Sequence, residues 1–350
     1  MPRVINVHTH FQPSGIEEAL IPHGLAWITN PDGSHTFTAG AIEYRMPPTK
    51  PRQAGFYGAE LHTRIPYMDE EGVDVHLLSA SPMMFGYHLD PGSAVEVARI
   101  FNDALAADIA RFPDRFWGAA QLPMQDPEAA TRELERAVRE LGLASCSVGW
   151  SFGPTRTLGH PDYDGLLAKA VELDVPVMIH PVALGQSTDL VAGGADWLTE
   201  YDLDSLWGYI YVETAAVVGM IFSGALDRHP DLRLFVPHGG GMIPYHVGRV
   251  EQYASFTRQH PDRVQLQRSI PEYLEQFYFD TIVHDPRGMK LLIDVMGADN
   301  VVLGTNWSGW DDAPLWDVIR ELDGVSDEAK DRILGLNATE RLYRASAAAV

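Results

Sequence analysis

Short apolar runs and longer stretches with helical spacing alternate along almost the whole chain. Eight apolar runs are predicted strands: Val4–Val7, Val73–Ser79, Phe116–Gln121, Ala144–Trp150, Val175–His180, Leu232–Pro237, Phe277–Thr281 and Val301–Gly304. Between them lie predicted helices: Leu61–Glu71, Ala94–Arg111, Pro127–Leu141, Tyr163–Leu173, Val212–His229, Pro286–Met296 and Pro314–Leu322. Apolar runs without alternation are typical of a parallel sheet that is covered on both faces. Eight strand–helix units therefore predict an α/β fold, a closed (β/α)8 or TIM barrel.

Two segments interrupt this alternation. Residues 11–58, rich in proline, glycine and polar residues, are interpreted as an insertion after the first strand. Residues 183–211 are interpreted as a long loop after the fifth strand. In this class of barrel the loops that follow the strands build the active-site face, so both segments are expected there. We interpret residues 1–350 as a single barrel domain.

Composition and charge narrow the possible partners. The chain has 350 residues, 45% hydrophobic and 21% charged, which is typical of a globular protein. Its formal net charge is −22, with 26 Lys and Arg against 48 Asp and Glu. Without a basic cluster, this balance argues against nucleic acid and anionic membranes as partners. The single cysteine, Cys146, excludes an internal disulfide framework. No leader sequence or long apolar span is visible, and we expect a cytoplasmic protein.

Histidines stand at the ends of three predicted strands. His8 and His10 are two residues apart, so in a strand their side chains share one face. His180 and His238 each end or directly follow an apolar run, VPVMI and LRLFVP respectively. Because strand ends on one face of a barrel converge, we expect the four imidazoles to meet in one pocket. Imidazole is a typical ligand of zinc and of neighbouring divalent metals.

Two further features accompany these histidines. Three glycines, Gly239 to Gly241, follow His238, which indicates close backbone approach or unusual dihedral angles, or simply a strand-to-helix turn. At the end of the eighth strand, where such a metal site usually gains a carboxylate, the chain has Asn306.

Three other residues near strand or helix ends are candidates for the site, and a structural role explains a fourth, Glu213. His284 follows the seventh strand and is a candidate for lining the pocket. Phe85 is a candidate apolar wall, although core packing explains it nearly as well, and Trp307 is a further candidate substrate contact. Glu213 opens a predicted helix, where the helix dipole alone explains a carboxylate.

The chain resembles the amidohydrolase superfamily, and within it the aminocarboxymuconate-semialdehyde decarboxylase branch. Besides the four histidines, the resemblance is carried by SASPMMFGY at 79–87, FPDRFWGAAQLPMQDPE at 112–128, HGGGMIPYHVGR at 238–249 and FDTIVHDPRGMKLL at 279–292. It spans nearly the whole chain and is weakest in the two irregular segments.

The resemblance implies one divalent metal ion, usually zinc, with manganese as the alternative. His8, His10 and His180 match metal ligands, and residue 306 occupies the position of a further ligand. His238 matches a catalytic histidine that hydrogen-bonds the metal-bound water. The family chemistry is mostly non-oxidative decarboxylation of small unsaturated, heterocyclic or aromatic carboxylic acids, beside some hydratases and carbon–carbon hydrolases.

The resemblance also implies how the substrate is bound. Arg249 matches an arginine that binds the substrate carboxylate and reaches into the neighbouring subunit of a homodimer.

Three positions depart from the family pattern. Asn306 replaces an aspartate, and Val182 replaces the tryptophan that follows His-Pro in the decarboxylase itself. In the first insertion, the stretch DGSHTF is followed by Thr38, where the family has an arginine for a substrate carboxylate. The sequence selects none of three possible replacements: Arg45, Arg52 and Arg64. We therefore expect an altered acid pocket and a substrate other than that of the decarboxylase itself.

Three explanations of Asn306 compete. A neutral amide offers its carbonyl oxygen to a metal but does not accept a proton as a carboxylate does. If Asn306 is native, acid–base catalysis falls to His238 alone, which suits a lyase. If Asn306 is an engineered replacement of an aspartate, it traps a substrate complex. In the third explanation, Asp311 or Asp312 supplies the missing carboxylate. The leading hypothesis is a metal-dependent decarboxylase. The alternatives are a hydrolase or hydratase on the same site, and a binding protein without turnover.

Overall fold

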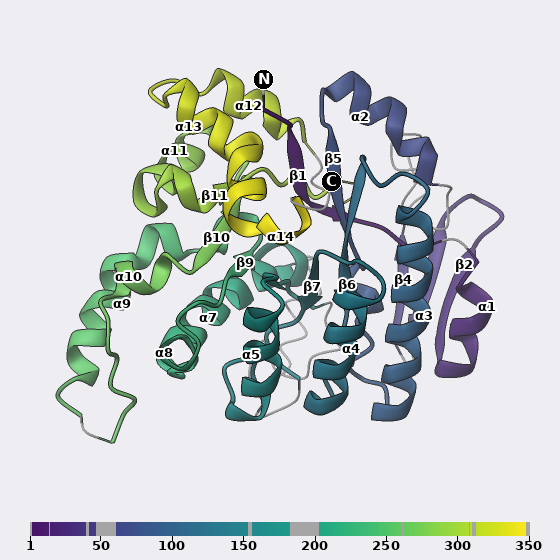
Figure 1. The fold of residues 1–350 in the computed structure, drawn as a ribbon, viewed down its shortest axis with the longest axis horizontal. Coiled ribbons are helices and arrows are strands. Elements are labelled where there is room, and N and C mark those ends of the chain that lie inside the picture. Colours follow the sequence, from purple (N-terminus) through teal and green to yellow (C-terminus); the bar gives the residue numbers. More distant parts are fainter. Residues whose placement is uncertain are drawn as a thin grey trace.

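Eight parallel strands form one sheet in the computed structural model, which describes residues 2–13, 15–39, 42–46, 61–152, 156–182, 203–260, 262–307, 309 and 313–347. In sheet order they are β1 (Ile5–His10), β5 (Val75–Ser79), β6 (Phe116–Gln121), β7 (Ser145–Val148), β8 (Val177–Ile179), β9 (Leu234–Val236), β10 (Phe277–Asp280) and β11 (Val301–Val302). The two ends of the sheet meet, because the Val7 N–H donates to the Leu303 carbonyl at 2.9 Å and Thr9 pairs with Trp307. The predicted (β/α)8 barrel is confirmed (Figure 1).

The helices surround this sheet. They are α2 (Ile65–Glu71), α3 (Pro91–Ile109), α4 (Pro127–Arg139), α5 (Asp164–Glu172), α7 (Tyr209–Phe222), α8 (Ala225–Arg228), α9 (Ile243–Thr257), α10 (Ile270–Leu274), α11 (Pro286–Met296), α12 (Leu315–Glu321), α13 (Asp327–Asp331) and α14 (Arg344–Ala347). An Asp-Pro pair starts three of them: Asp90, Asp126 and Asp285 each accept hydrogen bonds from backbone N–H groups of the first turn. Such caps satisfy donors that have no partner within the helix.

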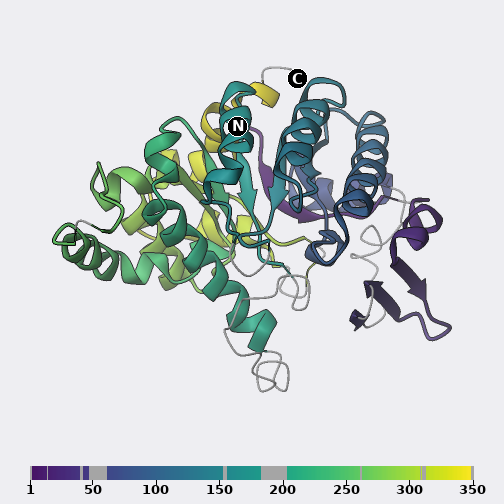
Figure 2. The same ribbon diagram turned by 90° about the horizontal axis from the view of Figure 1, so that it is seen from below.

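The insertion after β1 contains a small antiparallel sheet. Its strands are β2 (Leu25–Thr29), β3 (His35–Ala39) and β4 (Ile42–Met46), preceded by the short helix α1 (Glu17–Leu20). This sheet and the start of α7 project from the same side of the barrel in Figure 2, away from the marked chain ends. The described parts of the two irregular segments thus lie on one side of the barrel in this view. One boundary was wrong, because residues 204–211 of the expected loop are helical and form a π-helical turn and the start of α7.

A bulge in β1 decides which of its side chains face the barrel interior. Asn6 pairs with His76 and Thr9 with Leu78, so three steps along β1 oppose two steps along β5. The extra residue reverses the alternation of side chains. Val7 therefore joins the apolar cluster inside the barrel, while His8 and His10 contact the histidines that follow other strands.

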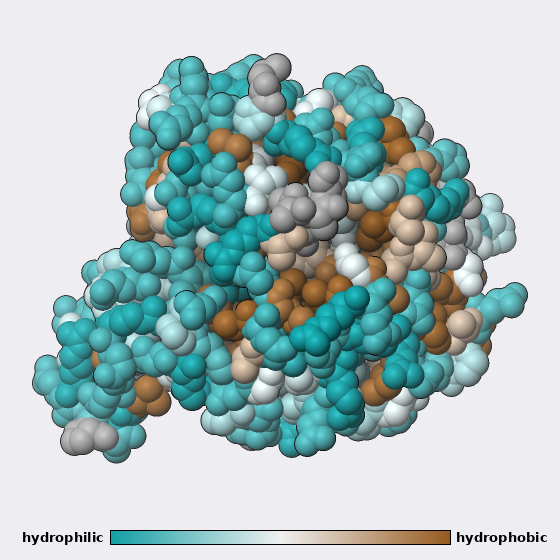
Figure 3. All heavy atoms as spheres, viewed as in Figure 1, coloured by the Kyte–Doolittle hydropathy of each residue, from teal (hydrophilic) through white to brown (hydrophobic). Residues whose placement is uncertain are grey.

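The barrel floor is closed by the C-terminal segment, since Ala338, Leu342 and Tyr343 pack in the same cluster as Ile5 and Val7. Within the described part of the chain, no helix is long and apolar enough to cross a bilayer. The face shown in Figure 3 is largely hydrophilic, with hydrophobic residues gathered near its centre.

Candidate metal centre

The four histidines from three strand ends lie together at the carboxyl end of the barrel. The ring centroids of His8 are 5.1, 5.2 and 5.3 Å from those of His10, His180 and His238. His10 and His180 are 5.0 Å apart. All four side chains are buried. The structure thus brings together the four imidazoles that the strand pattern placed at one end of the barrel.

An oxygen acceptor lies opposite the Nδ1 atom of every ring. These pairs are His8 with Asp280 at 2.7 Å, His10 with the Ala80 carbonyl at 3.2 Å, His180 with the Pro181 carbonyl at 2.7 Å, and His238 with Glu213 at 2.6 Å. Carbonyl and carboxylate oxygens accept hydrogen bonds, so Nδ1 is the nitrogen that carries the proton in each neutral ring. The lone pair of each imidazole therefore lies on Nε2.

The arrangement of these lone pairs fits a divalent metal ion. Nε2 of His8 and Nε2 of His10 are 3.3 Å apart. Two imidazole nitrogens that bind one tetrahedral zinc at about 2.0–2.1 Å are separated by about 3.3 Å. Ring nitrogens of His8, His180 and His238 all lie within 4.8 Å of one another. The buried Nε2 of His180 has no hydrogen-bond partner. Three of the rings, His8, His180 and His238, thus lie close enough to share one ion, and Nε2 of His10 lies beside that of His8.

Burial keeps His180 in the form that a metal requires. Desolvation, followed by repulsion from the neighbouring histidines, lowers the pKa of His180 well below its usual range. A neutral imidazole with a protonated Nδ1 and an oxygen behind it is the usual state of a metal-ligating histidine.

The glycines after His238 serve both purposes considered from the sequence. All three have positive φ angles, as does His238 itself at 48°. A Cβ at Gly240 would lie 2.4 Å from the Phe279 ring, and one at Gly241 would lie 2.4 Å from the Ile210 carbonyl oxygen. The turn therefore needs both unusual dihedral angles and close packing.

Positive φ angles also mark two other strand ends on this face. Asn306 follows β11 with φ of 51°, and His284 follows β10 with φ of 63°. Such angles are uncommon for residues other than glycine, and they concentrate at functional sites. The side chain of Asn306 is buried and packs against Gly309, where a Cβ would come within 2.3 Å of its Nδ2. His284 is exposed, outside the buried cluster of histidines.

Two buried carboxylates, Asp280 and Glu213, were not assigned to the site from the sequence. Asp280 ends β10 and was not singled out, although an acidic residue closing the apolar run FYFD was a usable signal. Glu213 was attributed to the helix dipole, and this was wrong. Helix α7 begins at Tyr209, so Glu213 lies beyond its first turn, fully buried against His238.

The other expected pocket residues have different surroundings. The ring of Phe85 lies 6.4 Å from that of His180, so this residue borders the cluster. Trp307 is buried 5.5 Å from the ring of His76, beside β1. Arg249 is exposed on α9.

Of the two candidate arginines that the structure describes, Arg45 and Arg64, one lies close to the histidines. Arg64 is fully buried, 4.4 Å from the Trp307 ring, and donates to the backbone carbonyl of His10. Arg45 is exposed on β4 and pairs with Asp32 at 2.9 Å. Arg52, Asp311 and Asp312 lie outside the described residues.

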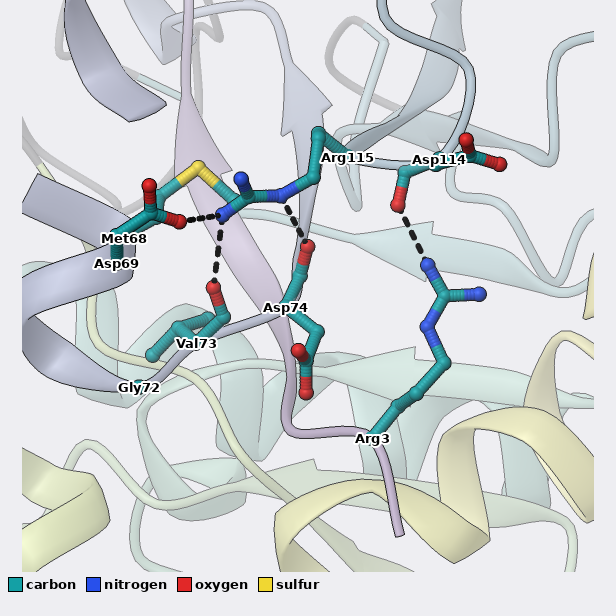
Figure 4. Close-up of a pocket in the computed structure, with 8 residues that line it drawn as sticks. All are labelled: Arg3, Met68, Asp69, Gly72, Val73, Asp74, Asp114 and Arg115. Atoms are coloured by element: carbon teal, nitrogen blue, oxygen red, sulfur yellow. Dashed lines mark hydrogen bonds and ion pairs between the residues drawn. The ribbon is translucent and has the colours of Figure 1, made fainter. Parts of the chain in front are cut away.

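A separate cavity of about 350 Å3 lies at the opposite, amino end of the strands (Figure 4). It is lined by Arg3, Met68, Asp69, Gly72, Val73, Asp74, Asp114 and Arg115. The Arg115 guanidinium donates to the Asp69 carboxylate and to the carbonyls of Val73 and Asp74. These hydrogen bonds connect the start of β6 to the end of α2 and to the segment before β5.

Comparison with known proteins identifies the family. The amidohydrolase family model matches residues 5–345, and the chain belongs to this family. The 2-amino-3-carboxymuconate-6-semialdehyde decarboxylase of Dictyostelium discoideum is 33% identical over 286 residues, which cover 80% of this chain and 75% of that protein. A gamma-resorcylate decarboxylase of Rhizobium radiobacter is 30% identical over 283 residues, covering 75% and 85%.

A hydratase and a solved decarboxylase structure are also similar. The 2-keto-4-carboxy-3-hexenedioate hydratase of Sphingobium sp. is 31% identical over 253 residues, covering 69% of this chain and 67% of that protein. The crystal structure of a dihydroxybenzoic acid decarboxylase from Polaromonas sp., with bound manganese and the inhibitor 2-nitroresorcinol, superposes with a TM-score of 0.75. It is 24% identical and covers 98% of this chain and 97% of its own, which shows the shared fold.

Proposed function

We propose that this protein is a metal-dependent decarboxylase of a small unsaturated, heterocyclic or aromatic carboxylic acid. The observation that supports this best is the meeting of four buried imidazoles, each with an oxygen acceptor behind Nδ1. The names of the relatives in two groups, a carboxymuconate-semialdehyde decarboxylase and a resorcylate decarboxylase, agree with this reaction class.

In this proposal His8, His10 and His180 hold the metal, and the Asn306 amide oxygen is its candidate further ligand. His10 and His180 face backbone carbonyls through Nδ1, which suits neutral ligands. Zinc and manganese both accept such a donor set, and manganese is bound in the solved dihydroxybenzoic acid decarboxylase. When bound, the ion supplies Lewis acidity that stabilises negative charge on the substrate.

His238 is proposed as the group that moves the proton. Its side chain is 8% exposed, whereas that of His8 is 0% exposed, so His238 is the more accessible of the two rings with a carboxylate behind them. The lone pair on Nε2 of His238 accepts a proton from solvent, and the ring then passes this proton to the carbon that bears the carboxylate. When the bond to the carboxylate breaks, its electron pair restores the double bond of the substrate and carbon dioxide leaves. Phe85 borders His180 and offers an apolar surface to the substrate ring.

Arg249 is proposed to bind the substrate carboxylate of the neighbouring subunit in a homodimer. Helix α9 carries it on its exposed side, together with Tyr245, Tyr253 and Phe256, which are 78%, 45% and 47% exposed. Exposed aromatic residues beside an arginine are enriched at protein–protein interfaces. His284 and Trp307 remain proposed substrate contacts.

A mixing experiment tests the role of Arg249. If it acts across the interface, mixing inactive Arg249→Ala with inactive His180→Ala protein regenerates about a quarter of the native sites in exchanged dimers. Activity that stays absent after subunit exchange contradicts the assignment.

The reaction itself is tested by carbon dioxide release from a panel of unsaturated and aromatic carboxylic acids, with His180→Ala protein as the control. Metal content is measured in parallel on the native chain and on Asn306→Asp, both purified without added metal. One equivalent in both proteins supports a site in which the histidines suffice. Metal in Asn306→Asp alone would mean that the amide weakens the site and that activity belongs to the aspartate form.

A hydratase is the second candidate, because a hydratase is among the relatives that cover two thirds of the chain. Adding water to a double bond on the same site releases no carbon dioxide. Incorporation of labelled solvent oxygen into the product, without gas release, favours this alternative.

A further inference from the structure

We propose that the two buried carboxylates behind the histidines are positioning residues with separate tasks. Asp280 holds the metal ligand His8, and Glu213 holds the proton-transferring His238. This inference rests on the proposed function, and it adds a division of labour between two His–carboxylate pairs that look alike in geometry, with Nδ1 to oxygen distances of 2.7 and 2.6 Å.

Both carboxylate oxygens of Asp280 accept hydrogen bonds from residues of the barrel. Its Oδ2 accepts from His8, and its Oδ1 accepts from the backbone N–H groups of Gly239 and Ile282, both at 3.1 Å. Gly304 packs so closely that a Cβ there would lie 2.7 Å from the Asp280 Cβ. A carboxylate fixed in this way on a strand leaves His8 one orientation. That rigidity suits a group whose task is to keep a metal ligand in place.

Glu213 belongs to a different element with a different anchor. It lies on α7, and the turn after His238 is fastened to this helix beside it. The hydroxyl of Thr214 accepts from the Met242 N–H at 2.9 Å and donates to the Ile210 carbonyl at 2.7 Å. The first of these bonds ties the turn to the helix, so the packing of the turn against α7 sets the distance between Glu213 and His238.

The two histidines also differ in their backbone. His8 lies within β1, whereas His238 lies in a turn with a positive φ angle and contacts the ring of Tyr209, 6.3 Å away on α7. Glu213 accepts the Nδ1 proton of this ring at 2.6 Å, so it is placed to select the tautomer and aim Nε2. A carboxylate behind a proton-transferring histidine has this role in other enzymes, where it orients the ring and keeps the proton on Nδ1.

Matched amide substitutions separate the two tasks. Glu213→Gln and Asp280→Asn change the same atoms, so each serves as the control for the other. For both proteins we would measure the metal dissociation constant by chelator competition without substrate, then kcat and KM for decarboxylation at saturating metal, with thermal unfolding as the check on folding.

The expected results differ in kind. Asp280→Asn weakens metal binding about 10- to 100-fold. Glu213→Gln leaves the metal dissociation constant and KM within about twofold and lowers kcat by about 100-fold or more. Glu213→Asp, which keeps the charge at shorter reach, recovers part of kcat. If both amide variants lose metal to the same extent, or if Glu213→Gln raises KM and leaves kcat unchanged, the division of labour is wrong.

The metal measurements separate failure of this inference from failure of the proposed function. A parent protein that binds metal but decarboxylates no acid contradicts the proposed function. In that case the selective loss of metal in Asp280→Asn, and its retention in Glu213→Gln, still supports separate tasks, whereas equal losses overturn them.

Discussion

Gly241→Ala is expected to damage the site through its backbone. Gly241 has φ of 68° and ψ of −126°, a combination that residues with a Cβ rarely adopt. A Cβ there would lie 2.4 Å from the Ile210 carbonyl oxygen and 2.6 Å from the Thr214 hydroxyl oxygen, where ordinary contacts begin near 3.4 Å. Both neighbours belong to α7, the helix that carries Glu213. Relief of the clash requires a shift of about 1 Å between the turn and α7.

The expected cost has two parts. Forcing alanine into this backbone conformation costs about 1–3 kcal/mol. Overpacking against a backbone oxygen costs about 1–3 kcal/mol more, because a carbonyl within a helix does not turn aside as a side chain does. We therefore expect unfolding free energy to fall by about 2–6 kcal/mol, a large share of the stability of a typical domain.

Urea unfolding of the purified variant measures this loss. Gly248→Ala is the matched control: it is the same substitution seven residues further on, at a position in α9 with open space around it. There alanine is expected to stabilise by up to about 1 kcal/mol through helix propensity. A Gly241→Ala protein within about 1 kcal/mol of the native one would refute the reasoning that the turn and α7 are closely packed.

Three further predictions concern metal, burial and pH. Metal at a thousandfold excess over its dissociation constant is expected to stabilise the native protein by about 4 kcal/mol, and to stabilise the His180→Ala variant far less. Calorimetry with and without chelator measures both unfolding temperatures. Equal increases in the two proteins would place the metal elsewhere. Gln12 is 1% exposed, and both of its amide atoms lack a hydrogen-bond partner. Gln12→Leu should therefore raise the unfolding free energy of the substrate-free protein by about 1–3 kcal/mol. A lower unfolding free energy would mean that the amide is hydrogen-bonded in solution. Hydrogen bonds from Arg344 lower the pKa of Asp174, so its stabilising contribution is present above its unfolded pKa of about 3.9 and disappears as pH falls through the lower folded value. Because Asp174 is 40% exposed, Asp174→Asn should cost no more than about 1 kcal/mol at neutral pH. The difference should vanish in strong acid, and one that persisted there would exclude the ion pair as its cause.

Local patterns were sufficient for the barrel itself. All eight predicted strands overlap observed ones, because a buried parallel strand needs a continuous apolar run and such runs are visible without knowledge of their neighbours. The seven predicted helices also overlap observed helices, whereas α1, α9, α10, α13 and α14 were not predicted. Helix α9 has an exposed aromatic side, which blurs the apolar stripe that marks an amphipathic helix.

The sequence by itself determined that His8, His10, His180 and His238 stand at strand ends, and in a closed barrel such ends converge. Only the tertiary structure decided what lies behind each ring. Asp280 is 272 residues from His8, and Glu213 is 25 residues from His238, with most of α7, helix α8 and strand β9 between them. These pairings depend on barrel closure, on the bulge in β1 and on the packing of α7 against the glycine turn. Each of these is a long-range contact, and local spacing carries no record of which distant residue will supply it.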